Sequence, residues 1–82
     1  MTKKDFYRDL KIDLRLEGNL SARIVGNKML VTNKSKHLSV NCKRNKVSIE
    51  YDGKVIEDQY YYTDNMVVLT SEKIVNILGN NL

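Results

Sequence analysis

The sequence predicts a small α+β domain with a short N-terminal helix, an antiparallel β-meander of five to seven strands and a short C-terminal helix. Apolar residues alternate with polar ones through most of the middle of the chain, which is the period of a half-buried strand. The turn signals Gly26-Asn27 and Asp52-Gly53 separate such runs, and helical spacing is confined to the two ends. The 82 residues hold no linker or repeat, which predicts a single domain, residues 1–82. An open sheet and a curled, barrel-like sheet both fit this pattern.

The N-terminal residues carry a helix start signal. Thr2 and Asp5 have the spacing of a capping box, in which the threonine oxygen accepts a hydrogen bond from the third backbone amide of the helix. We expect a helix over residues 3–10, with Phe6 and Leu10 among its buried side chains.

Residues 11–17 have two interpretations. Their apolar residues alternate strictly with charged ones, which indicates a first strand that pairs with residues 20–24 across a three-residue loop. The rival is one helix that continues to Gly18. We favour the strand, because Ile12 and Leu16 would lie opposite the apolar face of such a helix. Four acids at a spacing of four would also repel one another along that helix: Asp5, Asp9, Asp13 and Glu17.

The middle of the chain predicts a series of antiparallel strands. The expected strands are residues 28–33, 38–42 and 47–51, and a less regular one from Lys54 to about Tyr62. The turn at 26–27 sets Ile24 across from Met29, and the connection 43–46 sets Cys42 across from Val47. The second register places every apolar position of residues 38–42 and 47–51 on one face.

The C-terminal residues predict a short strand followed by a helix. Residues 63–65 resemble a turn, after which residues 66–69 form a short buried strand. Thr70 or Ser71 then caps a final helix of about eight residues that ends at Gly79.

The net charge of +4 is distributed unevenly along the chain. Residues 1–17 carry five bases and four acids, and residues 18–49 carry seven bases and no acid. From Glu50 onward there are six acids and two lysines. The middle of the chain is therefore a basic block between a balanced head and an acidic tail.

The residues able to perform chemistry form no catalytic or metal-binding set. His37 and Cys42 lie five residues apart on one predicted strand and so point to opposite faces, and Cys42 is expected in the core. No metal-ligand spacing and no glycine-rich phosphate loop occurs in the sequence. We therefore predict a protein that is not an enzyme and has no cofactor. One cysteine and no long apolar run predict a cytoplasmic protein without a disulfide, signal peptide or membrane span.

A meander places alternate turns at the same end of the sheet. This arrangement brings several residues of the basic block together at one end. The turn at 26–27 and the connection 43–46 lie at one end. Lys11, at the start of the predicted strand 11–17, and the end of the predicted strand 54–62 lie at the same end. Basic side chains neutralise phosphates and tyrosine rings stack on bases. We predict a binding module that binds nucleic acid through this basic tip, formed by Lys28, Lys43, Arg44, Lys46, Tyr60 and Tyr62.

Two other interpretations remain open. One is a protein-binding adaptor or inhibitor, of phage or mobile-element type, that acts on a host nucleic-acid enzyme. It would bind an acidic protein surface through the basic tip, or bind through an exposed sheet edge. The other is a homodimer that completes a thin core.

Overall fold

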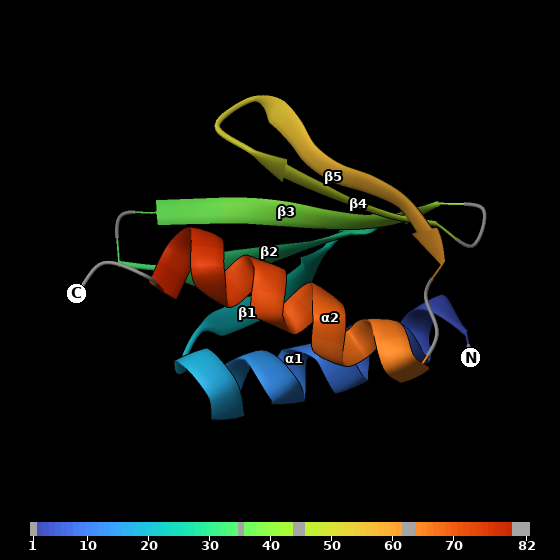
Figure 1. Ribbon diagram of the computed structural model, residues 1–82, viewed down its shortest axis with the longest axis horizontal. Coiled ribbons are helices and arrows are strands. Elements are labelled where there is room, and N and C mark those ends of the chain that lie inside the picture. Colours follow the sequence, from blue (N-terminus) through green and yellow to red (C-terminus); the bar gives the residue numbers. More distant parts are fainter. Residues whose placement is uncertain (1, 35, 44–45, 62–63, 80–82) are drawn as a thin grey trace.

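The protein has two layers, a five-stranded sheet and two helices that pack on one of its faces (Figure 1). The computed structural model describes residues 2–34, 36–43, 46–61 and 64–79. The elements are α1 (Lys3–Gly18), β1 (Ser21–Val25), β2 (Lys28–Asn33), β3 (Lys36–Lys43), β4 (Lys46–Tyr51), β5 (Lys54–Tyr61), α2 (Asp64–Ile74) and the π-helical turn η1 (Val75–Gly79). The predicted α+β class is confirmed, and the sheet does not close into a barrel.

The sheet is a simple meander with the strand order β1-β2-β3-β4-β5 and antiparallel neighbours. The predicted registers of β1 with β2 and of β3 with β4 are confirmed, because Ile24 pairs with Met29 and Cys42 pairs with Val47. Asp52 and Gly53 both adopt positive φ, as the two-residue turn between β4 and β5 requires. The β4–β5 register shifts twice around Ile49, which accounts for the weaker alternation in the sequence of β5.

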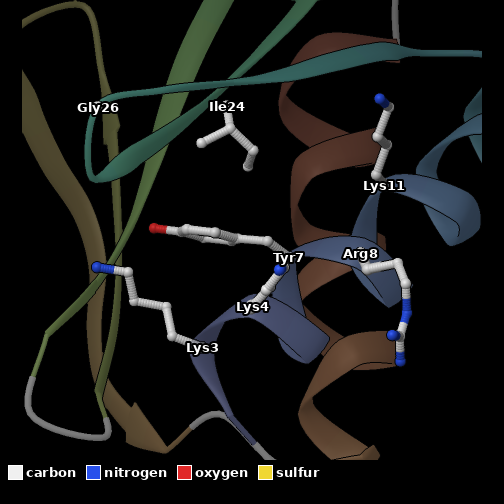
Figure 2. A pocket seen from close by; sticks show the side chains of 7 residues that line it. All are labelled: Lys3, Lys4, Tyr7, Arg8, Lys11, Ile24 and Gly26. Carbon is white, nitrogen blue, oxygen red and sulfur yellow. The ribbon is translucent and has the colours of Figure 1, made fainter.

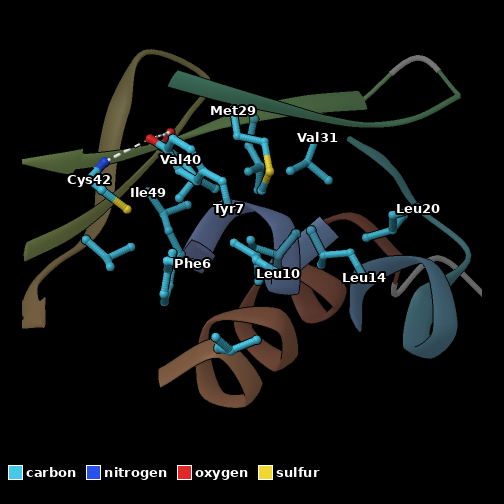
Figure 3. Close-up of a cluster of buried hydrophobic side chains, with 14 of the residues drawn as sticks. Phe6, Tyr7, Leu10, Leu14, Leu20, Met29, Val31, Val40, Cys42 and Ile49 are labelled. Atoms are coloured by element: carbon cyan, nitrogen blue, oxygen red, sulfur yellow. Dashed lines mark hydrogen bonds between the residues drawn. The ribbon is translucent and has the colours of Figure 1, made fainter. Parts of the chain in front are cut away.

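The core lies between the inner face of the sheet and the two helices (Figure 3). Alternate residues of β2, β3 and β4 point into it, and α1 and α2 supply the facing side chains. Its fully buried large members are Phe6, Leu10, Leu14, Met29, Val31, Leu38, Val40, Val47, Ile49, Ile74 and Leu78. Both helices therefore cover the same face of the sheet.

The predicted strand over residues 11–17 is wrong, because α1 continues without a break to Gly18. Of the three alternating apolar residues only Leu14 enters the core, whereas Leu16 is 78% exposed. The helix ends in a left-handed cap: Asn19 has φ 53° and donates its backbone N–H to Arg15, and the N–H of Leu20 donates to the carbonyl of Leu14. The alternation of only three apolar residues is a weaker indicator of a strand than the cap at Gly18 and Asn19 is of a helix end.

The acids along α1 also proved compatible with a helix. Thr2 caps the first turn by accepting a hydrogen bond from the N–H of Asp5 at 3.1 Å, as predicted. Arg8 lies 3.3 Å from the carboxylates of both Asp5 and Asp9. These ion pairs offset the repulsion between neighbouring acids that the sequence predicted.

The predicted short strand at residues 66–69 is also wrong, because this segment lies inside α2. Thr70 and Ser71 do not cap a helix; they are fully buried within one. A short apolar run fits a strand and a buried helix equally well, and here the helical spacing of Val67, Ile74 and Leu78 decides the outcome.

The two helices begin at the same end of the molecule (Figure 1), and η1, which follows α2, lies close to the end of α1. A Cβ atom on Gly18 would lie only 2.8 Å from Cγ2 of Val75. Gly18 therefore permits the approach of η1 to the end of α1. None of the described helices is long and apolar enough to cross a membrane.

Candidate nucleic-acid interface

No described residue covers the face of the sheet opposite the helices. Side chains alternate along a strand, so the neighbours of the buried residues point to this second face, and none of them is buried. We call it the open face; on β1 to β4 it carries Arg23, Val25, Lys28, Leu30, Thr32, His37, Ser39, Asn41, Lys43, Lys46, Ser48 and Glu50. Its chemistry is polar and basic, in contrast to the apolar inner face.

Positive charge dominates the open face. Among its described side chains on β1 to β4, four are basic, Arg23, Lys28, Lys43 and Lys46, and one is acidic, Glu50. The Nζ of Lys28 lies 4.0 Å from Oε1 of Glu50, and both side chains are about half exposed. An exposed pair of this kind adds little to stability and leaves the lysine accessible to an anion.

The basic charges of the open face concentrate at one end of the sheet. The β1–β2 turn, the end of β3, the start of β4, the end of β5 and the start of α1 all lie at this end (Figure 1). Lys43 and Lys46 are direct cross-strand partners, and Lys28 pairs with Asn41, two residues before Lys43. The structure thus brings together three of the six predicted site residues.

The other predicted site residues are placed only in part. The backbone of Tyr60 pairs with Val47, so this residue belongs to the strand that ends at the basic end. Arg44 and Tyr62 lie outside the described residues. Among the described side chains of the open face none is aromatic, so the basic charges are the part of the predicted tip that the structure can place.

The predicted position of Lys11 at the start of a strand is wrong. Lys11 lies on α1, where it lines a groove between α1 and β1 together with Lys4 and Arg8 (Figure 2). Sequence reasoning missed this set because it divided the helix at residue 11. The signal was present: Lys4, Arg8, Lys11 and Arg15 have the spacing of 4, 3 and 4 that places residues on one helix face. We call these four residues the basic stripe.

Tyr7 links the basic end of the sheet to α1. Its hydroxyl lies 2.9 Å from the carbonyl of Asn27 and 3.1 Å from that of Val40, and it accepts a hydrogen bond from the N–H of Cys42 at 3.0 Å (Figure 3). Burial raises the pKa of Tyr7 to about 12, so the hydroxyl stays protonated at neutral pH. This contact holds the β1–β2 turn and β3 in fixed positions, and Lys28 and Lys43 with them.

Cys42 and His37, the two side chains weighed for catalysis in the sequence, lie on opposite faces of β3. Cys42 is buried in the core, as expected, and burial raises the pKa of its thiol to about 11, which disfavours the reactive thiolate. His37 is exposed on the opposite face of β3. The described residues contain no group of three or more His, Cys, Asp or Glu side chains arranged to hold a metal ion.

Comparisons with known proteins add no family to this description. No protein-family model matches the chain, and no curated protein or solved structure shows significant similarity to it.

Proposed function

We propose that the protein is a non-enzymatic module that binds nucleic acid through the basic end of its open face. The observation that carries the proposal is the cluster of Lys28, Lys43 and Lys46 at one end of the open face, where Glu50 is the one acid among the described side chains of β1 to β4. Such a surface attracts phosphates and releases the counterions that surround them.

The polar part of the open face suits a flexible, single-stranded ligand. Ser39, Asn41 and Ser48 are half-buried neighbours on β3 and β4 and offer hydrogen-bonding groups beside the lysines. A sheet surface can follow an extended strand whose bases are not locked in a duplex. We therefore expect a preference for single-stranded over double-stranded nucleic acid.

Fluorescence anisotropy with labelled single-stranded and double-stranded oligonucleotides, measured over a salt series, tests this proposal. Three neutralised phosphates predict a slope of log affinity against log salt of roughly −2 for a single strand, at about −0.7 per phosphate. Micromolar affinity with this slope supports the proposal. Absence of binding at 50 mM salt, or binding that does not change with salt, contradicts it.

Two variants assign the binding to a place on the protein. Replacing Lys43, Arg44 and Lys46 by alanine should abolish salt-dependent binding. The matched control also removes three positive charges, from the opposite end of the sheet, by Lys34→Asn, Lys36→Ala and Lys54→Ala. Asn suits position 34 because Lys34 has φ 58°. Equal loss of affinity in both variants would mean that net charge alone, without a located site, drives the binding.

A second candidate function is that of a protein-binding adaptor or inhibitor. The observation that favours it is the edge of β1 beside α1, with which no other described strand pairs.

A further inference from the structure

The two edges of the sheet are built differently. β1 pairs with β2 over all five of its residues without a register shift, whereas the pairing of β4 with β5 shifts twice. Bulges and twists protect edge strands against further pairing, and β1 has no such irregularity. Four of its five residues are exposed, including Ile24 and Val25. Within the described ranges, no other strand pairs with the free edge of β1. This edge therefore offers unpaired backbone donors and acceptors.

A groove runs between this edge and α1 (Figure 2). Its larger part has a volume of about 580 Å³ and its smaller part a volume of about 320 Å³, and Lys11 lines both. Tyr7 and Ile24 supply apolar surface to the larger part, and Leu20 and Ala22 supply it to the smaller. The groove thus combines an apolar lining with the backbone edge of a strand.

The basic stripe forms the α1 side of the groove. Lys4, Arg8 and Lys11 line the larger part, and Lys11 and Arg15 line the smaller. Arg8 is held by two acids of its own helix. No carboxylate in the described part of the chain forms an ion pair with Lys4, Lys11 or Arg15. Three members of the basic stripe are therefore available to an anionic ligand, and Lys3 also lines the larger part of the groove.

We propose that this groove binds an extended acidic peptide segment of a partner protein, which joins β1 as an additional strand. In a strand, every second side chain points the same way, at intervals of about 6.7 Å. Neighbouring members of the basic stripe are separated by about 4.5 to 6 Å along the helix axis. Acidic residues at every second position of the peptide therefore match the stripe, while the peptide backbone pairs with β1. The groove binds a different class of ligand from the basic end of the open face.

Charge also distinguishes this occupant from a second copy of the chain. Pairing β1 with β1 of another copy would bring two basic stripes and two copies of Arg23 together, which opposes association at low ionic strength. An acidic peptide gains from the same charges and from the strand edge. A nucleic acid would neutralise the charges but has no peptide backbone with which to pair with β1.

Binding of designed peptides tests the proposal directly. The probe is a fluorescently labelled eight-residue peptide with alternating Glu and Val, compared with its Gln-Val counterpart. Two further peptides carry N-methyl groups on the odd or on the even residues, which blocks hydrogen bonding along one edge or the other. We expect measurable binding of the Glu-Val peptide, weaker binding of the Gln-Val peptide, and loss of binding for one of the two N-methylated peptides. Equal binding of both N-methylated peptides would overturn strand addition.

Variants of the protein locate the peptide. Lys11→Gln with Arg15→Gln removes two cations of the groove and also a like-charged pair at helical spacing, so it does not weaken α1. We expect at least about a fivefold loss of affinity for the Glu-Val peptide, because exposed ion pairs contribute a few-fold each. The control, Lys43→Gln with Lys46→Gln, should leave the affinity for this peptide unchanged. The reverse pattern would assign the peptide to the open face and overturn the proposal.

Hydrogen exchange identifies the edge. Bound Glu-Val peptide should slow the exchange of amides in β1, residues 21–25, by at least about tenfold, while amides of β5 keep their rates. Protection of β5 alone, or no protection at a saturating peptide concentration, contradicts the proposal. So does a concentration-dependent dimer in sedimentation whose β1 amides are already protected without peptide, because a second copy would then occupy the edge. Nucleic-acid binding is scored separately, with Lys43 and Lys46 variants, so that either proposal can fail alone.

Discussion

The two faces of the sheet are made by the same strands but obey different constraints. On the inner face, residues such as Met29, Val40 and Ile49 are fully buried against the helices, and each must fit its neighbours. On the open face, their sequence neighbours are partly or fully exposed, and four of them carry positive charge. Burial thus determines the inner face, whereas the fold leaves the open face free to carry the charges of a binding surface.

Adjacent residues on the two faces should differ most in their contribution to stability. Met29→Ala is expected to lower the free energy of unfolding by about 2 to 5 kcal/mol, because it leaves a cavity in the core. Leu30→Ala, one residue further on the open face, should cost less than about 1 kcal/mol. Urea unfolding of both variants measures the difference. Equal losses would show that another surface, such as a second copy, covers the open face under the conditions used.

The contrast between the faces explains how much of the fold the sequence could predict. The turn Gly26-Asn27 predicted the register of β1 with β2, and the alternation of Val40, Cys42 and Val47 predicted that of β3 with β4. The helices were harder, because Ile12 and Leu16 produce strand-like alternation although both are exposed on α1. A local pattern cannot show that an apolar side chain stays outside the core.

The candidate site was predictable to the same extent as the sheet. The sequence predicted that Lys28, Lys43 and Lys46 lie at one end of the sheet, because the location of these residues follows from the strand order alone. Lys11 was misplaced because its position depended on the division of α1. The groove beside β1 could not be predicted, because it exists only once a helix packs next to the edge strand.

The Tyr7 hydroxyl tests whether the inner face also positions the basic end. Tyr7→Phe removes its hydrogen bonds and leaves the buried N–H of Cys42 and carbonyl of Val40 without this partner. We expect a loss of about 1 to 3 kcal/mol in the free energy of unfolding. Tyr51→Phe is the matched control, because no hydrogen bond of its hydroxyl occurs among the described residues. A loss of the same size in both variants would contradict the role given to Tyr7.

Alkaline pH should lower the free energy of unfolding through two buried groups of the inner face, Tyr7 and Cys42. Burial raises the pKa of Tyr7 from 10.0 to about 12 and that of Cys42 from 9.0 to about 11. Both groups are neutral when protonated, so the unfolded chain releases these protons at lower pH than the folded protein does. Their contribution is therefore complete below about pH 9 and is lost as pH rises through 11 to 12. Unfolding measured from pH 8 to 12 should show a smaller decline for Tyr7→Phe with Cys42→Ala than for the wild type; an equal decline would refute this origin.

The smallest expected effect lies on the open face and has the opposite sign. Lys43 and Lys46 face each other across the β3–β4 pair, and like charges directly opposite destabilise a sheet. Lys46→Glu should therefore raise the free energy of unfolding by about 0.2 to 1 kcal/mol, and Lys46→Gln by a smaller amount. The same Lys46→Glu variant should lose affinity for single-stranded nucleic acid, because it places a carboxylate among the phosphate contacts. A gain in stability together with a loss of binding would show that this pair is retained at a cost to the fold. A variant that is less stable than the wild type would instead mean that the two lysines do not repel each other in the folded protein, which would weaken the case for an anion-binding cluster at this end.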